Sequence, residues 1–274
     1  MKQLNLFIEL TRLKKPIGYM LLFWPCAWGL TLAYDFSNNL NDYFFYLVLF
    51  FLGSVLMRSA GCIVNDILDK EFDKKVSIKL GLAYVIYLCL IALLVLLNFN
   101  TLTIVLALGS MPLAFVYPLM KRYTYWPQLF LGITFNYGLI LGWVCIKSQI
   151  DMLPIIFYVG AIFWTLGFDT IYGYQDIKDD EIIGVKSTSI KFKKNPELFL
   201  IVCYLIFTIS LILVGLFMKF NLMYYFSLAL TALHLFFYQI YNFNFKDPKN
   251  SLMIFKSNNF LGVVVLCNIL IGKI

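Results

Sequence analysis

The chain has little charge and few of the residues that build metal or disulfide sites in soluble domains. Only 14% of its 274 residues are Asp, Glu, Lys or Arg, whereas 61% are hydrophobic. This balance excludes an ordinary water-soluble domain. The single histidine, His234, cannot form a histidine-ligated metal or haem site alone and is interpreted as a packed core residue. The six cysteines form no CxxC pair, which argues against a disulfide or zinc framework.

The hydrophobic residues occur in long continuous stretches, and the mean hydropathy is +0.82. A bilayer core about 30 Å thick needs roughly 20 apolar residues per helix. The sequence therefore predicts an all-α, polytopic membrane protein that forms one domain over residues 1–274. The last span is the weakest, because Lys256 and two asparagines enter it. About nine spans are expected, near residues 17–34, 43–64, 80–98, 102–120, 128–146, 152–172, 198–217, 221–241 and 254–272.

The basic residues predict an orientation, because Lys and Arg favour the cytoplasmic side of a membrane. Between these spans, all 22 Lys and Arg residues fall on one side except Lys147, Lys219 and Lys273, and Arg58 lies inside a span. We therefore expect a cytoplasmic N-terminus and an outer C-terminus. The net charge of +7 is then explained by topology and lipid attraction rather than by nucleic-acid binding. The first apolar stretch has no clear cleavage site, and the absence of a transit-type segment favours a bacterial inner membrane.

Two acidic clusters follow even-numbered spans, on the predicted cytoplasmic side. The run NDILDKEFD contains Asn65, Asp66, Asp69 and Asp73, and Asn65, Asp69 and Asp73 share one helix face at i, i+4, i+8 spacing. A second cluster, in DIKDD, places Asp176 and Asp180 at i, i+4. Oxygen-rich sites of this kind suit Mg²⁺, which usually bridges carboxylates to substrate phosphates. A solvated acidic loop is the plain alternative for each cluster.

Four further residues are candidates for contact with a substrate. Arg58 lies two helical turns below Asn65 on the same face, where a guanidinium can hold an anionic group. The alternative is a structural pairing with Asp169. Tyr117 and Lys121 end the fourth span at i, i+4, and they either enter the same mouth or anchor the helix at the interface. Lys186, in GVKST, has the same two interpretations.

The aromatic residues, 18% of the chain, suit packing and also a cavity for a carbocation, because a ring face attracts positive charge. A cation-coupled transporter is the rival interpretation from another class. Its carboxylates are expected near the bilayer midplane on broken helices, not at span exits.

The motifs together resemble a known family. NDILDKEFD matches the NDxxDxxxD motif, YPLMK the YxxxK motif and DIKDD the DxxxD motif of the UbiA-type intramembrane aromatic prenyltransferases. The segments RLKKPIGYMLLFWP, MRSAGCIVND, GVKST and FKSNNFLG resemble the branch that prenylates 4-hydroxybenzoate for ubiquinone. The resemblance covers nearly the whole chain.

The resemblance implies a helical bundle around a central cavity that opens sideways to lipid. It implies Mg²⁺ held on a polyprenyl diphosphate by Asn65, Asp69, Asp73, Asp176 and Asp180, with Asp66 as a further contributor. It also places Lys121 at the leaving diphosphate, Tyr117 as a hydrogen-bond donor and Arg58 at the benzoate carboxylate. The motifs recognise the diphosphate, so a naphthoate, homogentisate or haem acceptor stays open. No obligate protein partner is implied.

One departure from the family concerns the loop after the first aspartate motif. Family members carry an RTxxRPxxSG-like segment there, whereas this chain runs from FDKKV into SIKLGLAYV. Roughly a dozen residues that cover the diphosphate are missing. The sequence therefore predicts weaker donor binding and impaired activity, because a shorter lid exposes the site to water.

Overall fold

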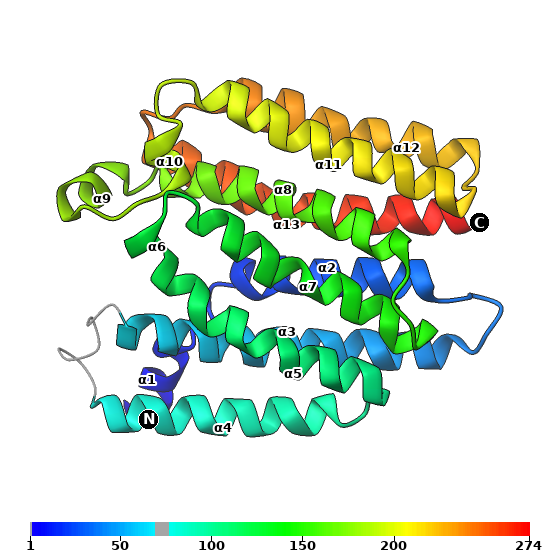
Figure 1. Cartoon of the computed structure of the whole chain (residues 1–274), viewed down its shortest axis with the longest axis horizontal. Helices are drawn as coiled ribbons and strands as arrows, with labels where there is room; N and C mark the ends of the chain where they lie inside the picture. Colours follow the sequence, from blue (N-terminus) through cyan, green and yellow to red (C-terminus); the bar gives the residue numbers. More distant parts are fainter. Residues whose placement is uncertain (1, 69–76) are drawn as a thin grey trace.

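The computed structural model describes residues 2–68 and 77–274, and within these ranges every regular element is helical (Figure 1). Ser77 caps the helix that follows residues 69–76, and Asn100 caps the next. The elements are α1 (Lys2–Leu10), α2 (Ile17–Ala33), α3 (Leu40–Leu68), α4 (Ile78–Leu96), α5 (Thr101–Val116), the 3₁₀ turn η2 (Tyr117–Leu119), α6 (Met120–Tyr123), α7 (Pro127–Lys147), α8 (Met152–Gly173), α9 (Ile177–Ile183), α10 (Thr188–Lys191), α11 (Pro196–Met218), α12 (Leu222–Ala232), the π-helix η3 (Leu233–Ile240) and α13 (Pro248–Lys273).

The predicted all-α membrane bundle is confirmed, and each expected span coincides with a helical segment. Among the described residues, seven helices are long and apolar enough to cross a membrane. The other two expected spans are α2, with 17 residues, and α12, which continues into the π-helix η3. The span over 101–123 is broken at η2 because Pro118 has no backbone N–H to continue the α-helical bonding.

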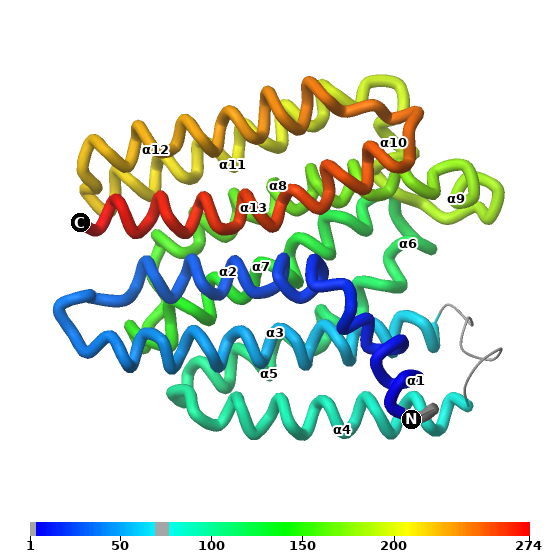
Figure 2. Tube along the Cα trace, turned by 180° about the vertical axis from the view of Figure 1, so that it is seen from behind, coloured from blue at the N-terminus to red at the C-terminus, as the bar shows by residue number. Residues whose placement is uncertain are grey.

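The helices stack in layers that both ribbon views show in the same order, from α4 through α3 and α5, α2 and α7, and α8 and α13 to α11 and α12 (Figures 1 and 2). The helix α2 packs most extensively against α7. A Cβ on Gly142 would lie 2.3 Å from the carbonyl oxygen of Cys26, so only a glycine lets these two backbones approach this closely.

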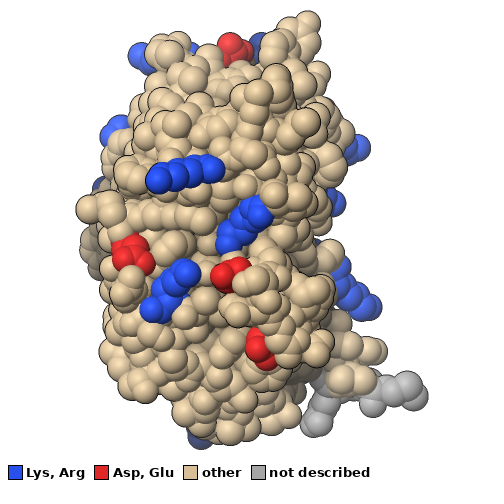
Figure 3. Space-filling view, turned by 90° about the vertical axis from the view of Figure 1, so that its right-hand side faces the viewer, with Lys and Arg blue, Asp and Glu red and all other residues tan. Residues whose placement is uncertain are grey.

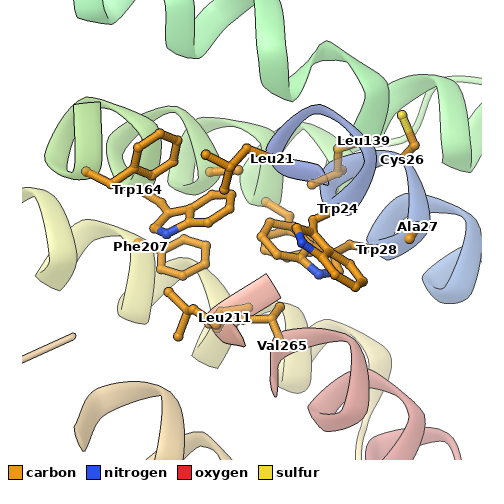
Figure 4. Packing of buried hydrophobic residues seen from close by; sticks show 14 of the residues in the cluster. Leu21, Trp24, Cys26, Ala27, Trp28, Leu139, Trp164, Phe207, Leu211 and Val265 are labelled. Atoms are coloured by element: carbon orange, nitrogen blue, oxygen red, sulfur yellow. The ribbon is translucent and has the colours of Figure 1, made fainter. Parts of the chain in front are cut away.

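Aromatic side chains fill the centre of the bundle. Trp28, Trp164 and Phe207 are fully buried and lie against one another, with ring centroids 5.0 to 6.2 Å apart (Figure 4). Such pairs contribute attraction between ring edges and faces in addition to burial of apolar surface.

The segment FKSNNFLG of α13 accepts hydrogen bonds from three tryptophan N–H groups. Trp164 donates to Asn258 Oδ1 at 2.8 Å and Trp24 to Asn259 Oδ1 at 2.9 Å. Trp28 donates to the carbonyl oxygen of Gly262 at 3.0 Å. The two asparagines that made the last span look weak are therefore satisfied inside the bundle, as buried polar groups must be.

The two ends of the bundle differ. One end carries the short elements α1, α6, α9 and α10 (Figure 1). The other end has short connections, and Figure 3 shows its largely uncharged surface with a few charged side chains. Lys147, Lys219 and Lys273 all lie at this second end, at the C-termini of α7, α11 and α13. The sequence grouped these three residues on one side, and the structure agrees.

Candidate active site at one end of the bundle

A cavity of about 380 Å³ lies at the end of the bundle that carries the short helices. Its walls come from the start of α2, the ends of α3 and α8, the η2 break, α6, the first half of α7, α9, the loop before α10 and one residue of α13. Among the predicted site residues, six line this cavity: Arg58, Asn65, Tyr117, Lys121, Asp180 and Lys186. Residues spread over 128 positions of sequence therefore meet at one place, as the motifs predict.

The mouth of the cavity carries oxygen donors from two helices. Asn65 lies near the end of α3, and Asp180 lies in the first turn of α9. Asp176 precedes α9 as its N-cap residue, and its carbonyl oxygen accepts a hydrogen bond from the Asp180 N–H at 2.9 Å. The predicted i, i+4 relation is thus a real helical turn. Asp176 is exposed and stands beside the cavity lining rather than in it.

Asp66, the next predicted ligand, is bound to another side chain. Its carboxylate accepts a charge-assisted hydrogen bond from Arg12 Nη2 at 2.6 Å. Arg12 itself lines the cavity and has a backbone φ of 53°, in the left-handed region that non-glycine residues rarely adopt. The pair fixes the segment between α1 and α2 against the first aspartate motif.

Asp69 and Asp73 lie outside the residues that the structure describes. Within residues 2–68 and 77–274, no three His, Cys, Asp or Glu side chains gather in a way that could hold a metal ion. The described part of the predicted metal set is therefore Asn65 and Asp180 at the cavity, with Asp66 and Asp176 next to it.

The electrostatics at the mouth disfavour charge on Asp180. Burial raises the pKa of the Asp180 carboxyl above its usual value, and the negative charges of Asp176 and Asp179 raise it further. Lys121 opposes this shift. A carboxylate held among like charges is stabilised by a cation, so the site is electrostatically prepared to bind one.

The loop that carries Lys186 is tied to the η2–α6 segment. The Lys186 N–H donates to the carbonyl oxygen of Lys121 at 2.9 Å, and Nζ donates to the carbonyl oxygen of Tyr123 at 3.2 Å. Nζ also lies 5.7 Å from the centroid of the Tyr125 ring. The structure thus brings Lys121 and Lys186 side by side at the mouth, where two cations can face an anion.

Deeper in the cavity, Arg58 lies among aromatic rings. Its Cζ is 5.5 Å from the centroid of the Phe135 ring, at a distance typical of a cation–π contact. Arg58 also interacts electrostatically with Tyr117 and Asp169, which line the same cavity. Within the described part of the chain, however, Arg58 and Asp169 form no ion pair. Both side chains line the same cavity.

A second, apolar cavity of about 600 Å³ adjoins the first. It lies between α3, α4, α5 and α7, and Arg58, Tyr117 and Phe135 line both cavities. Two of its lining residues, Ile86 and Leu90, are 59% and 57% exposed on the outside of the bundle. The apolar cavity therefore opens sideways on the surface that faces lipid in a membrane.

The comparisons with known proteins agree with this geometry. The model of the UbiA prenyltransferase family matches residues 22–261. The chain belongs to the UbiA prenyltransferase family. With its apolar helices, it is an integral membrane protein.

Members of this family with similar sequences cover the whole chain. The mitochondrial 4-hydroxybenzoate polyprenyltransferase of Bos taurus is 40% identical over 289 residues, which cover 100% of this chain and 76% of the relative. The 4-hydroxybenzoate octaprenyltransferase of Hydrogenovibrio crunogenus is 33% identical over 286 residues, which cover 100% of this chain and 99% of the relative.

Solved structures of the family share the fold. The apo UbiA homologue from Aeropyrum pernix K1 gives a TM-score of 0.73 at 22% identity and covers 94% of this chain and 99% of its own. The UbiA homologue from Archaeoglobus fulgidus bound to GPP and Mg²⁺ gives 0.69 at 18% identity, with 97% of both chains covered.

Several residues of the cavity were not predicted from the motifs. Asp169 was considered only as a partner of Arg58, although a carboxylate near the end of a span was a usable signal. Arg12 belongs to the RLKKP segment, whose role no spacing rule indicates. Phe135, Phe168 and Tyr172 are among many aromatic residues in spans, and only the fold shows that they line the cavity. His234 is buried next to Gln239, which confirms the core interpretation.

Proposed function

We propose that the protein transfers a polyprenyl group from a polyprenyl diphosphate to the ring carbon of 4-hydroxybenzoate ortho to the hydroxyl, in a Mg²⁺-dependent step of ubiquinone biosynthesis. The observation that carries this proposal is the junction of the two cavities at Arg58, Tyr117 and Phe135. A polar cavity with cations and oxygen donors meets an apolar cavity that opens toward lipid. A molecule with a charged head and a long apolar tail fits both at once.

The residues at the mouth fit Mg²⁺ with a diphosphate. Mg²⁺ keeps several waters and uses one or two carboxylates together with phosphate oxygens, so a complete protein cage is not required. Asn65, Asp176 and Asp180 would hold the ion, together with Asp69 and Asp73, which the family motif implies. Asp66, expected as a further ligand, is paired with Arg12 here. When bound, the ion neutralises charge on the diphosphate and so makes it a better leaving group.

The basic residues complete the diphosphate site. Lys121 and Lys186 stand side by side at the mouth and would bind the diphosphate oxygens as negative charge develops on them. Such stabilisation of a leaving group is worth most where water is partly excluded. The apolar cavity between α3, α4 and α5 would take the prenyl chain.

The acceptor would lie against Arg58. A guanidinium binds a carboxylate through two parallel hydrogen bonds, which fixes the orientation of a benzoate ring. Tyr117, close to Arg58, would donate a further hydrogen bond. The rings of Phe135, Phe168 and Tyr172 line the same space and would face the allylic cation while excluding water.

The test is a membrane assay with geranyl and longer prenyl diphosphates and with 4-hydroxybenzoate, homogentisate and a naphthoate, with and without Mg²⁺. We expect a prenylated product that needs 4-hydroxybenzoate and Mg²⁺ and that is lost in Asn65→Ala and Asp176→Ala. The matched control is Asp42→Asn, an exposed carboxylate in the first turn of α3, at the opposite end of that helix. Product that survives both site substitutions would refute the proposed site, and ion uptake in proteoliposomes without prenyl transfer would favour a transporter.

The shortened loop after the first aspartate motif lies outside the described residues. We propose that the shorter loop lowers the affinity for the donor, because it excludes water from the diphosphate less well. The aligned stretch with the bovine relative spans 289 residues against 274 in this chain, so the relative carries residues that this chain lacks. A variant with a family-type segment inserted after Asp73 is expected to have a lower KM for the donor. Equal rates and KM values for the two proteins would contradict this.

For the location, we propose a bacterial inner membrane with the acidic mouth and the N-terminus in the cytoplasm and the C-terminus outside. The distribution of Lys and Arg supports this orientation. Cysteines placed singly at exposed positions 39 and 179, at opposite ends of the bundle, would test it. A thiol reagent that cannot cross the membrane should label position 39 from the periplasmic side and position 179 only in inverted vesicles.

A further inference from the structure

Asp169 is the carboxylate in the cavity that the diphosphate and metal sites do not use. It lies on α8, four residues before the helix ends at Gly173, and it lines the cavity together with its neighbours Phe168 and Tyr172. Within the described ranges, its carboxylate takes part in no hydrogen bond or ion pair. This carboxylate lines a cavity and has no hydrogen-bond partner among the described residues. Such a group indicates that a bound ligand supplies the partner.

Asp169 and Arg58 line the inner part of the same cavity from two different helices. Arg58 precedes the mouth residue Asn65 by seven positions of α3, which at 1.5 Å per residue places it roughly 10 Å below Asn65. Asp169 lies on α8, before that helix ends and the chain turns into α9, which carries the mouth residue Asp180. It is near enough to Arg58 and Tyr117 to interact electrostatically with both, so it belongs to the same deep part of the cavity. The two charges interact electrostatically without pairing.

The proposed reaction needs a proton acceptor at this deeper level. When the new bond forms at the ring carbon ortho to the hydroxyl, that carbon still carries its hydrogen, and the proton must leave before aromaticity returns. The oxygen donors at the mouth would hold the metal and diphosphate, and Lys121 and Arg58 are cations that cannot accept a proton. Tyr117 and Tyr172 are neutral donors. Of the described groups in the cavity, Asp169 alone combines the required depth with a free lone pair.

We propose that Asp169 is the catalytic base that removes the ring proton of the acceptor, an inference that rests on the proposed function. The C1–O bond of the donor breaks and its electron pair leaves on the diphosphate. The ring π-electrons form the new C–C bond to C1. Asp169 Oδ then takes the proton from the substituted ring carbon, and the C–H electron pair restores the ring. The neutral Asp169 later loses the proton to water at the open mouth.

The test compares Asp169→Asn and Asp169→Glu with the wild-type enzyme, using 4-hydroxybenzoate with hydrogen or deuterium at both positions ortho to the hydroxyl. General-base catalysis contributes about 10²- to 10⁴-fold. We expect Asp169→Asn to lower kcat by this factor while the KM for the donor is unchanged. We also expect a primary isotope effect in this variant, because proton removal becomes rate-limiting, and little effect in the wild type, where ionisation of the donor limits the rate. Asp169→Glu keeps a carboxylate and should recover part of kcat.

The controls separate this inference from the proposed function and from a structural role. Wild-type turnover of 4-hydroxybenzoate tests the proposed function by itself. Stabilisation of each variant against thermal unfolding by Mg²⁺ and geranyl diphosphate shows that it is folded and binds the donor. If Asp169→Asn keeps the wild-type kcat, or loses activity only through the KM for the acceptor with no isotope effect, Asp169 serves as a counter-ion to Arg58 and the inference is wrong. The Asp169→Glu variant decides the question if Asp169→Asn does not fold.

Discussion

Replacing Gly18 by alanine is expected to move the Arg58 guanidinium and thereby weaken binding of the acceptor. A Cβ at position 18 would lie 2.7 Å from Arg58 Nε, 3.4 Å from Nη2 and 3.5 Å from Cζ. Ordinary contact begins near 3.4 Å, so Nε has to retreat by about 0.7 Å. Gly18 is the second residue of α2 and lines the same cavity. Because the nearest atoms belong to the guanidinium group of a flexible side chain and not to backbone, we expect the side chain to move and the helices to keep their places.

The magnitude follows from the hydrogen bonds at stake. A hydrogen bond to a charged group is worth about 1.5 to 3 kcal/mol, and 1.4 kcal/mol corresponds to about tenfold in binding. A misplacement near 1 Å at an active site costs up to about 10²-fold. We therefore expect the KM for the acceptor, 4-hydroxybenzoate, to rise about 10- to 100-fold. The KM for the donor should stay within about twofold, because the diphosphate site lies at the mouth.

The assay is steady-state kinetics with each substrate varied in turn, for Gly18→Ala, Arg58→Ala and the double variant. Gly109→Ala is the control, because a Cβ at this exposed helical position meets nothing within 4 Å. If Arg58 transmits the effect, Gly18→Ala has no further consequence in the Arg58→Ala background. An unchanged KM for the acceptor in Gly18→Ala, or an equal effect in both backgrounds, would refute the reasoning.

Three further predictions concern the metal site, the chain cavity and the packing. The pKa of Asp180 is raised, and only the ionised carboxylate binds a cation. As the pH is lowered, Mg²⁺ affinity should therefore begin to fall at a higher pH than it would with an exposed aspartate as the ligand. Titration of the protein with Mg²⁺ in the presence of geranyl diphosphate, at several pH values between 5 and 8, tests this. The Asp180→Asn variant should lose this pH dependence of Mg²⁺ affinity. Gly53→Phe, in the apolar cavity with nothing within 4 Å of its Cβ, should lower kcat/KM for long donors about tenfold more than for geranyl diphosphate; equal losses would contradict the cavity assignment. Gly142→Ala brings a Cβ within 2.3 Å of the Cys26 carbonyl oxygen and should destabilise the protein by about 1 to 3 kcal/mol in thermal unfolding, whereas Gly109→Ala should not.

The spans were predictable from the sequence because burial in a bilayer requires long apolar blocks, and those blocks are visible residue by residue. The mouth of the site was predictable because Asn65 and Asp180 belong to short motifs whose members share a helical turn. The short helices α1, α9 and α10 were not predicted, since elements of four to nine residues carry little periodic signal.

In the deep part of the site, the position of Arg58 below Asn65 was expected from helical spacing, whereas the place of Asp169 in the same cavity was not. Arg58 and Asp169 are 111 residues apart in the chain, and they meet in one cavity because α3 packs on α2, α2 on α7 and α7 on α8. The weakness assigned to the last span also had a tertiary explanation. Asn258 and Asn259 are polar residues with buried partners, and those partners, Trp164 and Trp24, lie on other helices. A hydropathy scale scores such asparagines as unfavourable in a span, because it does not include the hydrogen-bond donors that they contact in the folded protein.

The indole bonds to α13 have a consequence for biogenesis. Trp24 and Trp28, on α2, donate to Asn259 and to the Gly262 carbonyl, which follow them by 235 and 234 residues. Their N–H groups therefore find these acceptors only when the final helix has entered the membrane. Gly18 and Phe255, from these same two helices, both line the cavity. The cavity is therefore fully enclosed only after α13 has been inserted beside α2.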